Sequence, residues 1–338
     1  MEMLSTEQLK EAWLNSRPVE FGDPVLAHAS FPFRRDYSPL GFPVTLTSNS
    51  EEVLEAADQS WGSSVRIFDT EPIRLQIGVT QGESRICPPT PGCNMSGHLI
   101  TSIADSENFR VCDISQGSGI AWITTAALQH RDYFRYFFLE SAVLSILANR
   151  FATAIHAGCV ALDGTGILLC GDSGAGKSTL SYACARAGWS YITDDASFLV
   201  HGRDDRLVVG NCHQVRFRPS AEALFPEIHG YSIMHRAGVG KPSMELSTDE
   251  NAAITRSSTA QIRHIVFLQR KVAKQELVEF PTAVARLSMQ QCARSMPWQL
   301  QVKMEVIDGL LALGALELRY NDLDWAVERL ILLACEGR

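Results

Sequence analysis

The stretch "GDSGAGKST", residues 171–179, decides the fold because it requires a strand before it and a helix after it. It fits the pattern G-x-x-x-x-G-K-[ST], in which glycines let backbone N–H groups turn inward around a phosphate. In this pattern Lys177 reaches the outer phosphates and the hydroxyl of Ser178 holds magnesium. The apolar run "GILLC" at 166–170 precedes the loop and a helix-forming stretch follows it, so the context agrees with the pattern.

The loop therefore predicts binding of ATP together with Mg²⁺, and the positive end of the following helix adds to the attraction for phosphate. The alternative is a glycine-rich turn that merely starts a helix, and it leaves Lys177 and Ser178 unexplained. The residues expected to surround the nucleotide are Gly171, Asp172, Ser173, Gly174, Ala175, Gly176, Lys177, Ser178 and Thr179.

An acidic pair, Asp194 and Asp195, follows Lys177 after 17 positions. This distance leaves room for one short helix, a stop at Gly188 and one short strand. We therefore expect the pair at the end of that strand, facing the phosphates. A guanine-specific switch protein would carry an N-K-x-D element and a transport-type ATPase an L-S-G-G-Q signature, and the sequence has neither.

Composition favours a soluble globular protein, since 46% of the residues are hydrophobic and 20% are charged. A length of 338 residues suggests two domains, which we place at 1–125 and 126–338. The net charge of −8 opposes nucleic-acid binding. No apolar run is long enough to cross a membrane, and the polar start does not resemble a signal peptide, so we expect a cytoplasmic protein without membrane contact.

The first 125 residues predict a small α+β unit, in which short β-rich runs surround a helix at 50–61 that is announced by Ser50. No catalytic pattern occurs there, so we expect this unit to serve recognition or assembly, with a homo-oligomer as one outcome. Apolar spacing then predicts one long helix over 132–151, with Asp132 as its N-cap.

The C-terminal third predicts further strands and a final helix. We expect a strand pair within "LVVGNCHQVRFRP" (207–219), a polar loop at 238–258 and a strand at 262–270. The stretch 315–335 predicts a strand followed by an amphipathic helix, capped by Asn321 or Asp322.

Three elements in order resemble the bacterial HPr kinase/phosphorylase family, whose catalytic domain has a PEP-carboxykinase-like nucleotide-binding core. They are "HAGCVALDGTG" from His156, the loop "GDSGAGKS", and "AGWSYITDDA" ending in the acidic pair. The resemblance is clear over 152–199, looser toward the C-terminus, and does not extend to roughly the first 120 residues. It implies an α/β P-loop core, α+β overall, with a smaller N-terminal α+β domain.

The resemblance also implies roles for individual residues. Ser178 and Asp195 would serve the magnesium, Lys177 the phosphates, and Asp194 would take the proton from an attacking hydroxyl. His156 would sit beside Asp194 and tune it. On the residues alone, Asp194 also fits a solvated strand-end turn, and His156 fits an ordinary core histidine.

Two departures from the family separate this chain from an enzyme that acts on HPr. Thr179 stands where the family usually has glutamate, and the Glu-Ile-Arg-Gly signature is only echoed by "QVR" at 214–216. The chain looks more similar to divergent HPr-kinase-related proteins, a group that includes kinases tailoring lasso-peptide precursors. The roles of Arg216, Arg236 and Lys241 are open at this stage.

Two hypotheses of function follow. The first is an ATP-dependent kinase that phosphorylates a serine-type hydroxyl on a peptide, protein or small molecule. The second is a non-catalytic ATP-binding regulator or sensor. An HPr kinase/phosphorylase acting on HPr itself and a PEP-carboxykinase-type enzyme are further alternatives. The intact pair of Asp194 and Asp195 favours the kinase, while the identity of the acceptor and the reverse phosphorolysis reaction are not encoded in any recognisable pattern.

Overall fold

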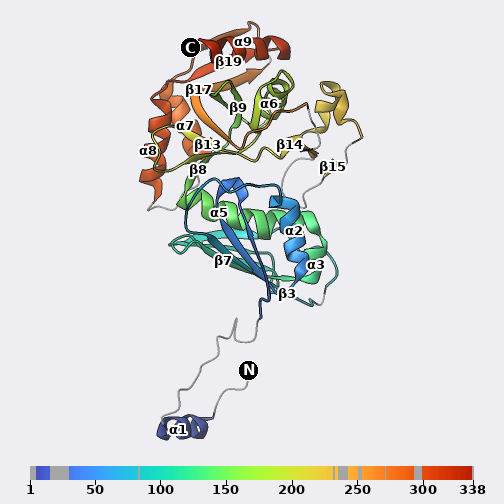
Figure 1. Ribbon diagram of the computed structural model, residues 1–338, viewed down its shortest axis with the longest axis vertical. Coiled ribbons are helices and arrows are strands. Elements are labelled where there is room, and N and C mark those ends of the chain that lie inside the picture. The colour runs from blue at the N-terminus through green and yellow to red at the C-terminus, as the bar shows by residue number, and fades with distance from the viewer. Residues whose placement is uncertain are drawn as a thin grey trace.

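The computed structural model describes residues 5–15, 30–82, 84–230, 233–234, 243–249, 253–270, 272–292 and 299–336. Two of the basic residues left open above, Arg236 and Lys241, lie outside this range, as does most of the loop that contains them. The described part is a mixed α/β structure with a seven-stranded, a nine-stranded and a three-stranded sheet (Figure 1). The first helix is α1 (Thr6–Leu14).

The seven-stranded sheet has the order β1-β2-β3-β7-β6-β5-β4. Its strands are β1 (Phe33–Tyr37), β2 (Val44–Ser48), β3 (Ile73–Thr80), β4 (Gly92–Ser96), β5 (Leu99–Ile103), β6 (Phe109–Asp113) and β7 (Ser118–Thr124). Burial alternates along β2, β5 and β6, because successive side chains of a strand point to opposite faces. The helix predicted at 50–61 is α2 (Glu51–Trp61); Ser50 occupies its N-cap position, but its side chain makes no capping hydrogen bond.

The prediction of a single helix over 132–151 is wrong, because a π-helical turn interrupts this segment. The elements are α3 (Thr125–Gln129), α4 (Arg131–Phe134), the π-helical turn η2 (Arg135–Glu140) and α5 (Ser141–Arg150). The N-cap of α4 is His130 and not Asp132. A π turn adds one residue per turn, so Arg135 and Glu140 meet as an ion pair at 3.1 Å, although they would point apart on an ideal α-helix.

Helix α5 lies between the two larger sheets (Figure 1). Its buried residues share one apolar cluster with the first sheet and with Ala152, Phe198, Val200 and Val209, which follow it in the chain. We call this cluster the shared core. The division into domains at 125/126 stays a prediction, and the packing of α3 to α5 against the first sheet favours a boundary near Phe151.

The nine-stranded sheet carries the order β11-β9-β10-β17-β13-β12-β8, with β19 added beside β17 and β18 beside β19. Its strands are β8 (Ala152–Ile155), β9 (Gly158–Leu162), β10 (Thr165–Cys170), β11 (Ser190–Thr193), β12 (Ser197–Val200), β13 (Leu207–Val209), β17 (Thr259–Arg270), β18 (Glu276–Glu279) and β19 (Leu316–Tyr320). Strand β17 runs parallel to β10 on one side and to β19 on the other, which brings three strand ends to one edge.

Helices cover both faces of this sheet. They are α6 (Lys177–Arg186), α7 (Thr282–Cys292), α8 (Leu300–Leu311) and α9 (Leu323–Cys335). Strand β10 is buried on both sides: Ile167 and Leu169 pack with α6 and α9, whereas Leu168 and Cys170 pack with α7 and α8. Its continuous apolar run is therefore typical of a central strand. Helix α9 is capped by Asp322, whose carboxylate accepts a hydrogen bond from the Trp325 amide at 2.7 Å, which decides between the two predicted caps.

The small third sheet corrects two predictions. Strands β13 and β14 (Gln214–Phe217) do not pair with each other; β14 pairs with β16 (Ser243–Ser247), and β15 (Ile233–Met234) completes the sheet. Strand β16 lies inside the segment predicted as a polar loop. It forms because Met244 and Leu246 alternate with polar residues and bury one face. The short 3₁₀ turns are η1 (Pro39–Gly41), η3 (Pro219–Ala223) and η4 (Pro226–Ile228).

None of the helices within the described ranges has the length and apolar character needed to cross a bilayer.

Candidate active site

The glycine-rich loop connects β10 to α6 and has the conformation that its sequence predicts. Gly171, Gly174 and Gly176 all have positive φ angles, of 139°, 96° and 104°, which side chains rarely adopt. At Gly176 a side chain is also excluded by contact, since a Cβ atom would lie 2.6 Å from the Tyr320 hydroxyl. Such alternation of left-handed residues turns successive N–H groups into a concave surface suited to an anion.

The loop lysine is held against the loop itself. Lys177 is only 6% exposed, and its Nζ donates to the carbonyl oxygens of Gly171, at 2.7 Å, and Asp172, at 3.2 Å. The amide of Ala175 donates to the same Asp172 carbonyl at 3.0 Å. The ammonium group therefore lies at the mouth of the loop, at the N-terminus of α6, where the helix dipole also favours negative charge.

Strand β11 returns the acidic pair to this loop, as the spacing predicts. The hydroxyl of Ser178 hydrogen-bonds the carboxylate of Asp194, so the first turn of α6 and the end of β11 are in contact. The approach depends on Gly158 in the neighbouring strand β9. A Cβ atom there would lie 2.5 Å from the Ser181 hydroxyl of α6 and 3.3 Å from the Asp194 carbonyl oxygen.

Asp194 is a buried carboxylate with a dense set of hydrogen bonds. It is 6% exposed, accepts from the Tyr191 hydroxyl at 3.1 Å on Oδ1, and accepts from the Arg216 amide at 3.2 Å on Oδ2. Burial, followed by the negative charge of Asp195, raises the pKa of Asp194, although Ser178 and Arg216 act in the opposite direction. A raised pKa makes this carboxylate a stronger base than an exposed aspartate.

Asp195 differs from Asp194 both in its exposure and in the direction in which its pKa is shifted. Its side chain is 62% exposed, and Oδ1 lies 3.1 Å from Nδ1 of His156. The hydrogen bond from His156 lowers the pKa of Asp195, helped by the charges of His156, Lys177 and Arg216. The expectation that His156 sits beside Asp194 is corrected, because the imidazole contacts the side chain and the backbone oxygen of Asp195. His156 directly follows β8 and its side chain is exposed. It is therefore not a core histidine.

The segment that echoes the family signature supports the acidic pair from β14. The Arg216 guanidinium donates from Nε to Glu245 of β16 at 2.9 Å. With its amide oriented to satisfy both neighbours, Gln214 donates to Glu245 at 2.9 Å and accepts from Arg216 at 2.8 Å. The backbone carbonyl oxygen of Gln214 accepts a hydrogen bond from the Tyr191 hydroxyl at 2.9 Å. Sequence reasoning missed Glu245, although the alternation of "SMELS" marks its strand.

Two further arginines border the glycine-rich loop and were also missed. Arg218 donates from Nη2 to the Ser173 hydroxyl at 3.0 Å. The side chain of Arg270, at the end of β17, lies 3.0 Å from the position of a Cβ atom on Gly176. Arg218 stands two residues after Arg216, directly after the end of β14, and continues the alternation of that strand, so the sequence contained a signal for it. The sequence contained no such signal for Arg270, because the pairing of β17 with β10 cannot be deduced from either strand alone.

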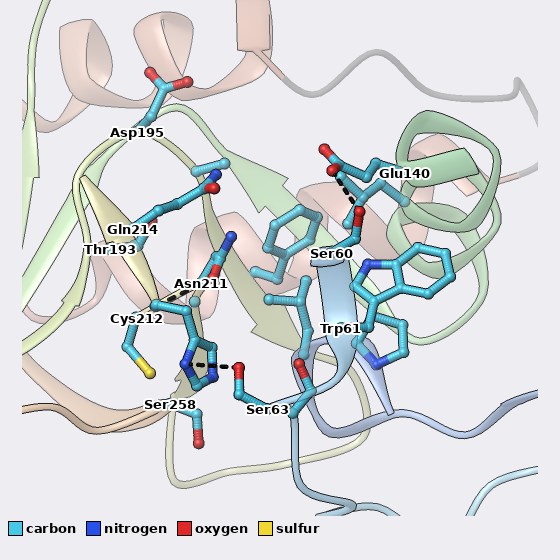
Figure 2. Close-up of a pocket in the computed structure, with 18 of the residues that line it drawn as sticks. Ser60, Trp61, Ser63, Glu140, Thr193, Asp195, Asn211, Cys212, Gln214 and Ser258 are labelled. Carbon is cyan, nitrogen blue, oxygen red and sulfur yellow. Dashed lines mark hydrogen bonds between the residues drawn. The ribbon is translucent and has the colours of Figure 1, made fainter. Parts of the chain in front are cut away.

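Asp194 and Asp195 also line a cavity of about 510 Å³ that separates them from the N-terminal part of the chain. Its walls come mainly from six segments: the η1 turn, the end of α2 with the turn after it, the π-helical turn, the acidic turn, residues within 210–216, and residues within 254–258. Figure 2 shows Asn211, Cys212 and Gln214 on one side and Ser60, Trp61 and Ser63 across from them. No pattern in the first 125 residues predicted this contribution.

The side chains present fit a nucleoside triphosphate with magnesium. Serine hydroxyl and carboxylate oxygens, as supplied by Ser178 and Asp195, are the hard donors that Mg²⁺ prefers, and it usually takes its remaining ligands from phosphates and water. The left-handed glycines and Lys177 form an anion cradle beside them. Among the described residues no group of three or more His, Cys, Asp or Glu is placed to hold a metal ion.

Comparison with known proteins gives one sequence relationship. A stretch of 109 residues, 32% of this chain, is 36% identical to the HPr kinase/phosphorylases of Limosilactobacillus reuteri strain DSM 20016 and L. reuteri subsp. reuteri strain JCM 1112. Over this stretch the chain is a divergent relative of the HPr kinase/phosphorylases. The match spans 33% of the length of each of these relatives, and no protein-family profile matches the chain.

A solved structure, the Hpr(Ser) kinase/phosphatase from Coxiella burnetii, aligns with 55% of this chain and 99% of its own. It is 14% identical, and its TM-score of 0.29 is too low to support any inference about this chain.

Proposed function

We propose that this protein is an ATP-dependent phosphotransferase that moves the γ-phosphate of ATP to a serine-type hydroxyl, that is, an aliphatic alcohol, on a peptide, protein or small molecule. The observation that carries the proposal is the position of Asp194, which touches Ser178 of the glycine-rich loop and also lines the 510 Å³ cavity. A hydroxyl held in that cavity would meet a carboxylate of raised pKa next to a phosphate cradle. The relationship to the HPr kinase/phosphorylases supports the same class of chemistry.

In this mechanism the acceptor hydroxyl gives its proton to the Asp194 carboxylate while its oxygen forms a bond to the γ-phosphorus, and the bond from that phosphorus to the β-phosphate oxygen breaks to release ADP. Lys177 and the loop amides neutralise the phosphate charge and hold the donor. Ser178 and Asp195 would hold Mg²⁺, which supplies charge neutralisation when bound. His156 keeps Asp195 ionised and oriented.

The second candidate is an ATP-binding sensor without turnover. A sensor needs the phosphate cradle. The sensor hypothesis does not explain why a buried carboxylate with a raised pKa, Asp194, lies in the wall of a separate cavity. A cytoplasmic location and a homo-oligomeric state stay predictions, while HPr as acceptor stays an alternative and the reverse reaction stays open.

Replacing each aspartate by asparagine tests the proposed division of roles. Asp194→Asn keeps the size and removes the proton acceptor, so phosphoryl transfer should fall by about 10²–10⁴-fold while Mg·ATP still binds. Asp195→Asn should instead weaken the Mg²⁺-dependent part of ATP affinity. The measurements are transfer from γ-labelled ATP to an acceptor mixture, and ATP affinity with and without Mg²⁺.

Both variants serve as controls for each other, because they place the same substitution at adjacent positions. Turnover of Asp194→Asn at the wild-type rate would exclude a base at this position. It would shift the role of proton acceptor elsewhere or favour the sensor.

A further inference from the structure

We infer that the 510 Å³ cavity is the acceptor site and that it takes a neutral, polyhydroxylated small molecule, such as a sugar or polyol, in place of a folded protein. The inference rests on the proposed phosphotransfer and names the acceptor for it. A cavity of this volume falls within the range of 300–1,000 Å³ that is typical of small-molecule sites. Asp194, the proposed base, is only 6% exposed and lies in this wall together with the end of α2 and the π-helical turn, which favours a small acceptor over a serine on a folded domain.

The charges in the wall argue against an acidic acceptor. Three arginines line the cavity, and each is already paired with a carboxylate: Arg135 with Glu140, Arg216 with Glu245, and Arg256 with Asp249. Asp194 and Asp195 add negative charge of their own. An incoming carboxylate or phosphate would therefore meet these carboxylates and, among the described wall residues, no arginine without a carboxylate partner.

The uncharged part of the wall suits a molecule rich in hydroxyl groups. It includes hydroxyls from Ser64 and Ser258 and the amide of Asn211. Hydroxyl and amide groups both donate and accept, which is what an alcohol requires to satisfy its own hydrogen bonds. Trp61 adds aromatic surface on the side opposite this amide (Figure 2). Such a wall orients a polyol without adding charge.

The π-helical turn is an independent sign of a binding site. Such turns are rare and occur frequently at functional sites. Here the turn places Arg135, Tyr136 and Glu140 in the cavity wall. Arg135 donates to Ser60 of α2 at 2.8 Å, and the Ser60 hydroxyl donates to Glu140 at 2.9 Å, so the N-terminal wall is locked by a closed set of polar contacts. Preorganisation of this kind is expected of a ligand site.

A cavity-filling substitution tests the site. Ser63 is an exposed residue in the turn after α2, and Ser63→Trp would fill the cavity from the side remote from the glycine-rich loop. We expect transfer from γ-labelled Mg·ATP to glucose and sorbitol, used as neutral probes, to fall at least about tenfold in kcat/KM. ATP affinity should stay within about twofold of the wild type. The matched control is Ser96→Trp, at an exposed position of β4 outside the cavity.

A charge substitution tests the acceptor class. Gluconate is the acidic counterpart of glucose at nearly the same size, and the wild type should discriminate against it. Glu140→Gln leaves the Arg135 guanidinium without its ion-pair partner. The ratio of kcat/KM for gluconate to that for glucose should then rise by about fivefold or more, an effect that mere loosening of the structure does not produce.

The outcomes separate the inference from the proposed function. If purified HPr or another acceptor is phosphorylated but neither neutral probe is, or if Ser63→Trp transfers as well as the wild type, the cavity assignment is overturned and the phosphotransferase stands. If Mg·ATP binds and no acceptor at all is phosphorylated, the phosphotransferase and the acceptor assignment both fail and the sensor is favoured. If the wild type binds no Mg·ATP, the proposed function fails and the acceptor assignment fails with it.

Discussion

At the scale of single residues, the acidic pair shows how two neighbouring aspartates acquire different chemistry. Asp194 is buried between Tyr191 and the amide of Arg216, whereas the Asp195 side chain is largely exposed and bonded to His156. Burial disfavours the charged form and an imidazole partner favours it, so the two pKa values move apart. Opposite shifts at adjacent carboxylates are typical of an acid–base assignment in an active site.

The raised pKa of Asp194 has a consequence for stability. Asp194→Asn should raise the Tm at pH 7, because ionising the buried carboxyl destabilises the folded state. The new amide loses no partner: its oxygen accepts from Arg216, and its NH₂ donates to Tyr191, whose hydroxyl donates to Gln214. The unfolded chain ionises first as pH rises above about 3.9. The gain in stability of Asp194→Asn over the wild type should therefore be complete above the pKa that Asp194 has in the folded protein. It should vanish below about pH 3.9.

Asp195→Asn provides a control of opposite sign. Its folded pKa is lowered by His156, so the ionised carboxylate contributes stability at neutral pH that is lost as pH falls through the folded pKa. This variant should have a Tm equal to or slightly below the wild type at pH 7, since the group is largely exposed. Thermal unfolding from pH 8 to pH 4 measures both variants. A lower Tm for Asp194→Asn at pH 7 would mean that its charge is well solvated.

At the scale of elements, strand β9 and helix α6 are held so close that only glycine fits between them. Gly158→Ala should destabilise the protein by about 1–3 kcal/mol, because the new Cβ would lie 2.5 Å from the Ser181 hydroxyl. It should also slow turnover by moving the acidic turn. Adding Ser181→Ala, which removes a buried hydroxyl that lacks a hydrogen-bond partner, should restore part of the loss. Chemical denaturation of the two single variants and the double variant measures the coupling.

Gly309→Ala is the matched control for this substitution. Gly309 lies within α8 with no atom near its missing Cβ, so alanine should stabilise the protein by about 0.5–1 kcal/mol. If the Gly158 variant behaves like the Gly309 variant, or if Ser181→Ala restores nothing, the close packing does not position the acidic pair.

The elements also show how far the sequence leads. The loop, α6 and β11 were predictable because local signals define them: an apolar strand, glycines and a stop at Gly188. The return of Asp194 and Asp195 toward the glycine-rich loop followed from their spacing to Lys177. The π-helical turn was not predictable, since its aromatic residues have ordinary helical spacing and only tertiary packing selects the extra residue. The cavity was equally hidden, because residues near Ser60 meet those near Gln214 only through the pairing of distant strands.

At the scale of the whole molecule, the shared core joins the two larger sheets. Phe198 and Val200 of β12 lie in the same apolar cluster as α5 and the first sheet. Separating the two parts would expose these buried surfaces, so we expect one cooperative unfolding transition. Saturating Mg·ATP should raise that single transition as a whole, because a ligand that binds only the folded state stabilises every part that unfolds with it.

Differential scanning calorimetry measures this with and without Mg·ATP. Two resolved transitions, of which Mg·ATP moves only one, would show that the N-terminal part is energetically independent and would remove the reason to expect it to shape the acceptor site.

The most direct test of the central claim is calorimetric titration of ATP, with and without Mg²⁺, into the wild type, Lys177→Ala and Lys274→Ala. Lys177 is buried in the loop, whereas Lys274 is an exposed lysine paired with Glu276 outside the site. The account predicts Mg²⁺-dependent binding by the wild type and Lys274→Ala, and affinity weakened by at least about tenfold in Lys177→Ala. Absence of Mg²⁺-dependent binding by the wild type at millimolar ATP, or equal affinity for all three proteins, would contradict it.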